Sequence, residues 1–132
     1  MRPNLFLLTL PTLALTLAGC QAKLSSSVTV DGKPFSAESC RSGQAAGFTG
    51  VDLVGTDGSR LRLVTMPNGQ AAAHIFAPGA ATSTELGACG PFTVERQNSQ
   101  INDIYNVKGT ATLSCTSGGH SVSGTITFEN CH

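Results

Sequence analysis

Short runs of alternating apolar and polar residues, separated by glycine-containing pairs, are the feature that most constrains how this 132-residue chain can fold. The pairs Asp31-Gly32, Asn68-Gly69 and Gly118-Gly119 readily take the positive φ of a two-residue hairpin turn. Period-two alternation accompanies these turns, and no window shows the 3.6-residue period of an amphipathic helix. The pattern predicts one all-β antiparallel domain, either a small β-sandwich or a partly open barrel.

Several strands can be placed from this alternation. A first hairpin is expected around Asp31-Gly32, and a meander of three strands should follow with turns about eleven residues apart. The expected strands are 28–30, 33–35, 48–54, 60–65 and 70–76, followed by a short strand at 92–96. Polar residues fill 97–103, so this segment is expected to be a solvated loop, with a recognition loop as the alternative.

The C-terminal segments 104–115 and 120–130 form the best defined pair of strands. A turn at Gly118-Gly119 would place Cys115 opposite Val122 and Gly109 opposite Phe128, where the glycine either forms a bulge or leaves room for the aromatic ring. The other face would then be lined by hydroxyl side chains and face solvent. Its residues are Thr110, Thr112, Ser114, Ser121, Ser123, Thr125 and Thr127.

The N-terminus has the pattern of an export signal. Arg2 precedes an apolar run at 5–18 that is too short to span a bilayer and contains Pro11, which makes a transmembrane anchor the weaker alternative. The run ends in Leu17-Ala18-Gly19-Cys20, which resembles the lipobox of bacterial lipoproteins at all four positions. The other alternative is an ordinary signal peptide, with Cys20 in a disulfide.

This resemblance implies the organisation of the whole chain. Residues 1–19 would be a lipoprotein signal peptide, and Cys20 would be lipidated with a diacylglyceryl group and usually an acyl chain such as palmitate. Residues 20–27 would then be the lipidated cysteine and a polar tether, and 28–132 a single β domain. Two or three chains make attachment stable without any protein surface. Because Gln21 is not Asp, the family's sorting rule implies the outer membrane of the cell envelope in a two-membrane host.

Four cysteines remain after Cys20, which predicts two disulfides in an exported chain. Three connectivities are possible, and no Cys-x-x-Cys spacing suggests a metal or redox site. In the expected register Cys115 faces the core, whereas Cys131 has the opposite parity to Phe128, so these two are not expected to bond to each other. The preferred pairing is therefore Cys40 with Cys131 and Cys89 with Cys115.

The sequence contains no recognised catalytic motif, so no enzymatic activity, metal or cofactor is expected. Alternation places His74 beside Phe76, where a structural histidine is the expected role. A triad of His74 with Asp52 or Asp103 and a serine can be drawn, but no local motif supports it. His120 and His132, at opposite ends of one strand, are expected to be solvated, and Tyr105 is the one candidate for a stacking contact.

Charge and aromatic content argue against nucleic acid, because 8 basic residues balance 8 acidic ones and the chain has no Trp. The segments Val28–Lys33 and Ile126–Cys131, together with the lipobox, resemble small β-sheet lipoproteins such as mycobacterial lipoprotein antigens, and the middle of the chain resembles uncharacterised lipoproteins of myxobacteria. This resemblance implies a membrane-anchored structural or binding module, with an envelope protein as a possible partner and the oligomeric state left open. The alternatives are a small-ligand or lipid carrier, which would need an apolar cavity, and an envelope hydrolase.

Overall fold

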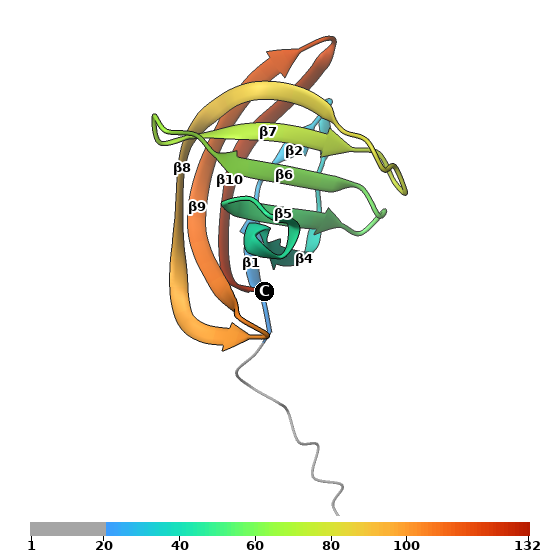
Figure 1. Cartoon of the computed structure of the whole chain (residues 1–132). Coiled ribbons are helices and arrows are strands. Elements are labelled where there is room, and N and C mark those ends of the chain that lie inside the picture. The colour runs from blue at the N-terminus through green and yellow to red at the C-terminus, as the bar shows by residue number, and fades with distance from the viewer. Residues whose placement is uncertain (1–20) are drawn as a thin grey trace, which may run out of the picture.

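A computed structural model describes residues 21–132 of the chain, so the expected signal peptide and Cys20 lie outside the described residues. The fold is a single antiparallel sheet of ten strands in the order β3-β2-β10-β9-β8-β7-β6-β5-β4, with β1 also paired to β10 (Figure 1). The strands are β1 (Lys23–Ser26), β2 (Thr29–Val30), β3 (Lys33–Pro34), β4 (Ala37–Ser42), β5 (Gly50–Gly55), β6 (Arg60–Thr65), β7 (Gln70–Phe76), β8 (Thr84–Ile101), β9 (Ile104–Ser117) and β10 (His120–Cys131).

The sheet curls into a half-barrel, which confirms the all-β prediction and selects the partly open barrel over the sandwich. In Figure 1 the long strands β8–β10 arch over the molecule, and β5–β7 run across them. The two edges, β1 and β4, come close to each other but are not hydrogen-bonded neighbours in the sheet. The disulfide between Cys40 of β4 and Cys131 of β10 joins these two sides of the opening.

Strand β8 is the corner that joins the two halves of the sheet. Its first part pairs with β7 as far as Pro91, and from Phe92 onward it pairs with β9. Gly90, with φ of 124°, lies at this change of partner, and a side chain there would overlap the carbonyl oxygen of Thr112. The glycine therefore allows one strand to bend from one half of the sheet into the other.

The first hairpin and the meander are confirmed. Asp31 and Gly32 have φ of 53° and 76°, the left-handed pair of a two-residue turn between β2 and β3. Strands β6 and β7 have the predicted bounds, whereas β5 begins two residues later than predicted. Phe48 instead follows the short 3-10 helix η1 (Gly43–Ala46), which is capped by Gly47.

The register of the C-terminal hairpin is also confirmed. Cys115 lies opposite Val122, and Gly109 lies opposite Phe128. A methyl group on Gly109 would come within 2.8 Å of the Phe128 ring, so this glycine does make room for the aromatic side chain. The outer faces of β9 and β10 carry the predicted hydroxyl residues, and these are exposed or half-buried.

The prediction of a loop at 97–103 is wrong. Strand β8 runs through this polar segment to Ile101, and Asn102 and Asp103, both with positive φ, form a two-residue turn into β9. Side-chain polarity did not prevent a strand here, because the backbone pairs with β9 whether or not the side chains are buried.

The expected tether is shorter than predicted, because Lys23–Ser26 forms β1. Ser25 pairs with Thr127 and Leu24 with Phe128, and Leu24 packs against the core. The edge of β10 supplies the hydrogen-bonding partners that a polar segment would otherwise find in water. Only Gln21 and Ala22 separate Cys20 from the sheet.

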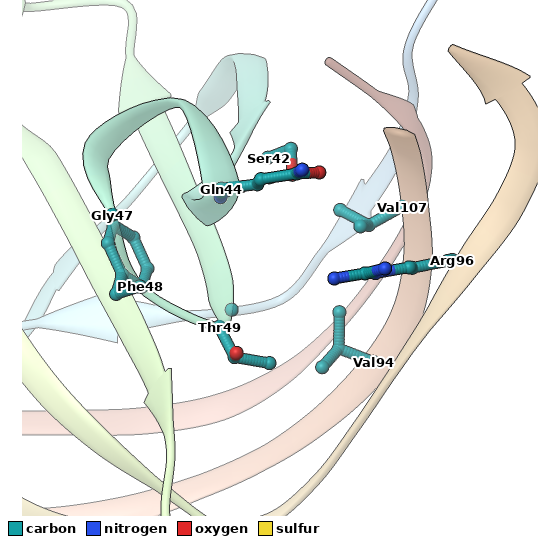
Figure 2. Close-up of a pocket in the computed structure, with 9 residues that line it drawn as sticks. Ser42, Gln44, Gly47, Phe48, Thr49, Val94, Arg96 and Val107 are labelled. Carbon is teal, nitrogen blue, oxygen red and sulfur yellow. Dashed lines mark hydrogen bonds between the residues drawn. The ribbon is translucent and has the colours of Figure 1, made fainter. Parts of the chain in front are cut away.

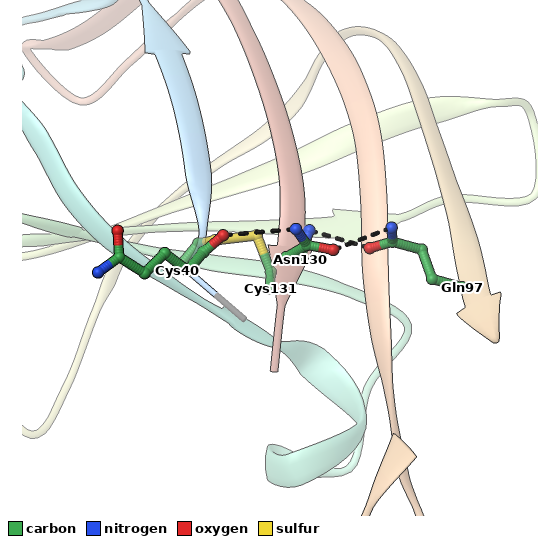
Figure 3. Close-up of a disulfide and its surroundings, with 5 residues drawn as sticks. Cys40, Gln97, Asn130 and Cys131 are labelled. Atoms are coloured by element: carbon green, nitrogen blue, oxygen red, sulfur yellow. Dashed lines mark hydrogen bonds between the residues drawn. A yellow bond between two sulfur atoms is a disulfide. The ribbon is translucent and has the colours of Figure 1, made fainter. Parts of the chain in front are cut away.

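Both predicted disulfides are present, Cys40–Cys131 and Cys89–Cys115. Parity alone would have turned Cys131 away from the core, but the register shifts at the end of β10, where Asn130 has φ of 57°. This bulge turns Cys131 into the core, where it is fully buried. Gln97 of β8 holds the bulge by accepting from the Asn130 N–H at 2.9 Å and donating to Asn130 Oδ1 at 3.1 Å (Figure 3).

The interior of the half-barrel is filled with side chains. The largest fully buried residues are Phe128, Leu53, Leu61, Leu63 and Ile126. Within residues 21–132, the one helical element is η1, in line with the absence of a helical period. No helix in the described part of the chain is long and apolar enough to cross a membrane.

Candidate functional site

A candidate binding site is a pocket of about 290 Å³ between η1 and the inner face of β8 and β9, here called the η1 pocket (Figure 2). The chain from η1 to the start of β5 forms one wall, and strands β8 and β9 form the other. Its lining residues are Ser42, Gln44, Gly47, Phe48, Thr49, Gly50, Val94, Arg96 and Val107. The pocket combines apolar side chains, hydroxyl groups and one cation, the mixture found in small-molecule sites.

Arg96 is the only charged residue that lines this pocket. It follows Phe92 and Val94 at period-two spacing, which places it on the inward face of β8, and Figure 2 shows its guanidinium directed into the pocket. The guanidinium carbon lies 5.2 Å from the centre of the Tyr105 ring, a cation–π contact that orients the group. No carboxylate among residues 21–132 forms an ion pair with Arg96.

Gln44 fixes the outer wall of the pocket. Its Nε2 donates to the backbone oxygen of Asp103 at 3.0 Å, and its Oε1 accepts from the N–H of Tyr105 at 3.1 Å. These two bonds fasten η1 to the turn between β8 and β9. Ser42 starts η1, and its buried hydroxyl oxygen accepts from the Gln44 N–H at 3.3 Å. The pocket is therefore held open by bonds that exist without a ligand.

The outer face of β5–β7 carries a second charged cluster, which is internally satisfied. Asp52 is only 6% exposed and accepts from Arg62 Nε at 2.7 Å and from its second nitrogen at 2.9 Å. The hydrogen bonds to Asp52 raise the pKa of the Arg62 guanidinium. The Arg62 guanidinium also stacks 4.6 Å from the Phe48 ring and 5.1 Å from Phe76, and the Arg60 guanidinium lies 4.0 Å from Phe76. This bidentate, stacked pair is a structural cluster.

His74 lies beside this cluster, on the same face as Phe76 as predicted. Its Nδ1 faces both Ser83 Oγ at 3.5 Å and Glu85 Oε1 at 3.8 Å. A serine relay needs the two ring nitrogens to serve different partners, one the nucleophile and one the carboxylate. Here both partners meet the same nitrogen, and the Asp52 carboxylate is bound by Arg62. The triad considered from the sequence is therefore not assembled around His74.

The remaining candidate residues are distributed over the molecule. His120 Nδ1 lies 2.9 Å from Asp31 Oδ2, and its side chain is 42% exposed. His132 Nε2 lies 3.0 Å from the backbone oxygen of Ile101, so each ring has a partner within the protein. The Tyr105 ring contacts the Arg96 guanidinium of the same chain, and stacking of Tyr105 on a ligand stays a prediction. No group of three or more His, Cys, Asp or Glu side chains in residues 21–132 is placed to hold a metal ion.

The sequence prediction missed Arg96, although a usable signal was present. Alternation from Phe92 through Val94 leads to Arg96 at a core-facing position, and a charged side chain at such a position is unusual. The signal was overlooked because the following polar segment suggested that the strand ended there. Comparison with known proteins gives no further guidance, since no family model, curated protein or solved structure matches this chain.

Proposed function

We propose that this protein is a lipoprotein of the bacterial envelope, anchored through lipid on Cys20, whose β domain is a binding module. The observation that carries the proposal is the start of β1 at Lys23, three residues after the lipobox cysteine. A domain whose first strand begins there needs no further linker, because the lipidated residue directly precedes the folded body. The lipobox Leu17-Ala18-Gly19-Cys20 supplies the attachment chemistry.

The short spacing limits how far the domain can move from the bilayer. Three residue steps from Cys20 to Lys23 span about 10 Å at most. The backbone oxygen of Gln21 also accepts from Asn130 Nδ2 at 3.4 Å, which ties this segment to the bulge of β10 (Figure 3). A lipidated Cys20 would therefore keep one particular end of the half-barrel at the membrane surface.

That end carries two features suited to a membrane-facing role. Ile101, at the tip of the β8–β9 hairpin, is the one exposed large hydrophobic residue among the described residues, at 54%. It lies near the C-terminus, because its backbone oxygen bonds to His132. The η1 pocket is close by, since Gln44 binds the same hairpin turn. In a two-membrane host, Gln21 favours the outer membrane.

A small-ligand carrier is the second candidate, and the η1 pocket favours it. The apolar cavity that lipid carriage would need inside the sheet is taken up by core side chains such as Phe92 and Phe128, whose ring centres are 6.2 Å apart. A ligand would instead be held at the η1 pocket, which has both polar and apolar walls. No enzymatic role is proposed, and an envelope protein remains a candidate partner.

Membrane fractionation of the protein and its Cys20→Ser variant tests the anchor. The unaltered protein is expected in the membrane fraction and to incorporate labelled fatty acid, whereas Cys20→Ser is expected to lose the label and the membrane association. Ala22→Ser, which changes the same segment outside the lipobox, should behave as the unaltered protein. Membrane association and labelling that persist in Cys20→Ser would overturn the proposal.

A further inference from the structure

We propose that the η1 pocket binds a small organic acid, with the ligand's carboxylate on Arg96 and its apolar part against Val94, Val107 and Phe48. The inference deepens the proposed function, because it names the ligand class of the binding module, but it does not depend on the lipid at Cys20.

The first argument is the charge of Arg96. Arg96 is exposed and lines the pocket beside the buried Val107 and the half-buried Val94, so a ligand in the pocket can reach its guanidinium. The two half-buried arginines, Arg60 and Arg62, by contrast both have the Asp52 carboxylate as a partner. Arg96 thus combines a position in a pocket with the absence of a carboxylate among the described residues, and an anionic ligand would supply that carboxylate.

The second argument is orientation. The Tyr105 ring covers one face of the Arg96 guanidinium, which leaves the nitrogen edge free to donate. A carboxylate matches this edge with two parallel hydrogen bonds. The Ser42 hydroxyl accepts from Gln44 N–H, so its own proton remains available for an acceptor in the pocket. The Thr49 hydroxyl lines the same space.

The third argument is the volume of the pocket and the mixture of one charged and several apolar side chains in its lining. A volume of about 290 Å³ is at the lower end of small-molecule pockets, so the ligand must be small. Arg96 is the single cation in the lining and can neutralise one negative charge. A carboxylate carries one such charge, whereas a phosphate dianion carries two. The valines and Phe48 favour a short hydrocarbon chain attached to that carboxylate over a free inorganic anion.

The test is an NMR titration of the oxidised full chain carrying Cys20→Ser, with hexanoate, hexanol and inorganic phosphate as separate probes. Hexanoate is expected to shift the side-chain signal of Arg96 and the amides of η1, whereas hexanol and phosphate bind more weakly. Arg96→Met should weaken hexanoate binding by about tenfold or more, which is the effect of losing a charged, bidentate contact. Arg96→Lys should retain part of the affinity for hexanoate, because lysine keeps the positive charge. The rest should be lost, because an ammonium group cannot form the two parallel hydrogen bonds of a guanidinium.

Arg41→Met is the matched control, since it removes the same charge from an exposed site outside the pocket and should leave hexanoate binding unchanged. Equal hexanoate affinity in Arg96→Met, or hexanol binding as tightly as hexanoate, would overturn the proposal. Preferred binding of phosphate would also overturn it, because it would leave only an inorganic-anion site. If Arg96→Met does not fold, the pH dependence of hexanoate binding to the protein with Arg96 intact tests the proposal instead. Binding must then weaken as the pH falls through the pKa of hexanoic acid, and binding independent of this titration contradicts the proposal.

Discussion

The two halves of the sheet share one core but have different outer faces. The outer face of β5–β7 carries the buried Asp52 paired with the half-buried Arg62, and Phe76, although buried, is not part of the core cluster. On β9 and β10 the outer face carries exposed serines and threonines and no ion pair among the described residues. The comparison shows that one half relies on a charged side-chain cluster, while the other relies on its backbone ladder and the packing beneath it.

The hydroxyl face has repeated but weak contacts. Thr127 pairs with Ser25 on one side and Thr110 on the other, and Thr110 pairs in turn with Thr93. The Thr93 and Thr110 hydroxyl oxygens lie 3.1 Å apart. Each such exposed pair contributes a few tenths of a kcal/mol, so this face tolerates substitution more readily than the face of β5–β7.

The largest effect is expected from the disulfide with the longer sequence separation, which joins β4 to β10 across the opening of the half-barrel. Replacing both Cys40 and Cys131 by Ala opens a link over 91 residues and should lower the free energy of unfolding by about 4.5 kcal/mol. The matched pair change at Cys89 and Cys115 opens a link over 26 residues, from the part of β8 that pairs with β7 to strand β9, and should lower it by about 3.5 kcal/mol. Guanidinium denaturation of both double variants measures the two losses in free energy of unfolding. A larger loss for the Cys89 and Cys115 variant would refute the prediction.

A smaller loss is expected when the packing of the long hairpin is disturbed. Gly109→Ala places a methyl group against the Phe128 ring and the carbonyl oxygen of Thr93, so the free energy of unfolding should fall by about 3 kcal/mol. Ser114→Ala, on the exposed face of the same strand, should change it by less than about 0.5 kcal/mol. Thermal unfolding of the two variants decides between them. Equal stability would mean that Gly109 is not needed for close packing.

The charged cluster gives the direct contrast between the two outer faces. Asp52→Ala leaves the half-buried Arg62 without its carboxylate and should lower the free energy of unfolding by about 2 kcal/mol. Thr110→Val, at an exposed position on the hydroxyl face, should change it by less than about 0.5 kcal/mol. If urea denaturation finds the two variants equally stable, the distinction between the faces fails.

The smallest effect is a pH dependence at the first hairpin. The hydrogen bond from His120 and then that from the Ser121 N–H hold the pKa of the Asp31 carboxyl below its usual value. A lowered pKa stabilises the fold above the unfolded pKa and loses that contribution as the pH falls through the folded pKa, which is below about pH 4. In Asp31→Asn this part of the acid destabilisation should be absent. Melting temperatures at neutral and acidic pH measure it, and parallel curves for the two proteins would contradict it.

Much of the fold could be predicted because local pattern and register agree. Glycine pairs with positive φ determine the turns, and alternation then identifies the inward side chains, as for Cys115 and Phe128. The sequence could not show that Asn130 forms a bulge, because this depends on Gln97 from a distant strand. The η1 pocket was missed for the same reason, since it forms only when η1 meets β8 and β9 in three dimensions.

The central claim, a lipid-anchored and disulfide-closed module, is tested most directly by the intact mass of the protein purified from membranes of its own host, with and without reduction. The account predicts the mass of residues 20–132 plus a diacylglyceryl group and an acyl chain, increasing on reduction by four hydrogens because Cys40–Cys131 and Cys89–Cys115 open. A mass without lipid would contradict the anchor, and a mass unchanged by reduction would contradict the two disulfides.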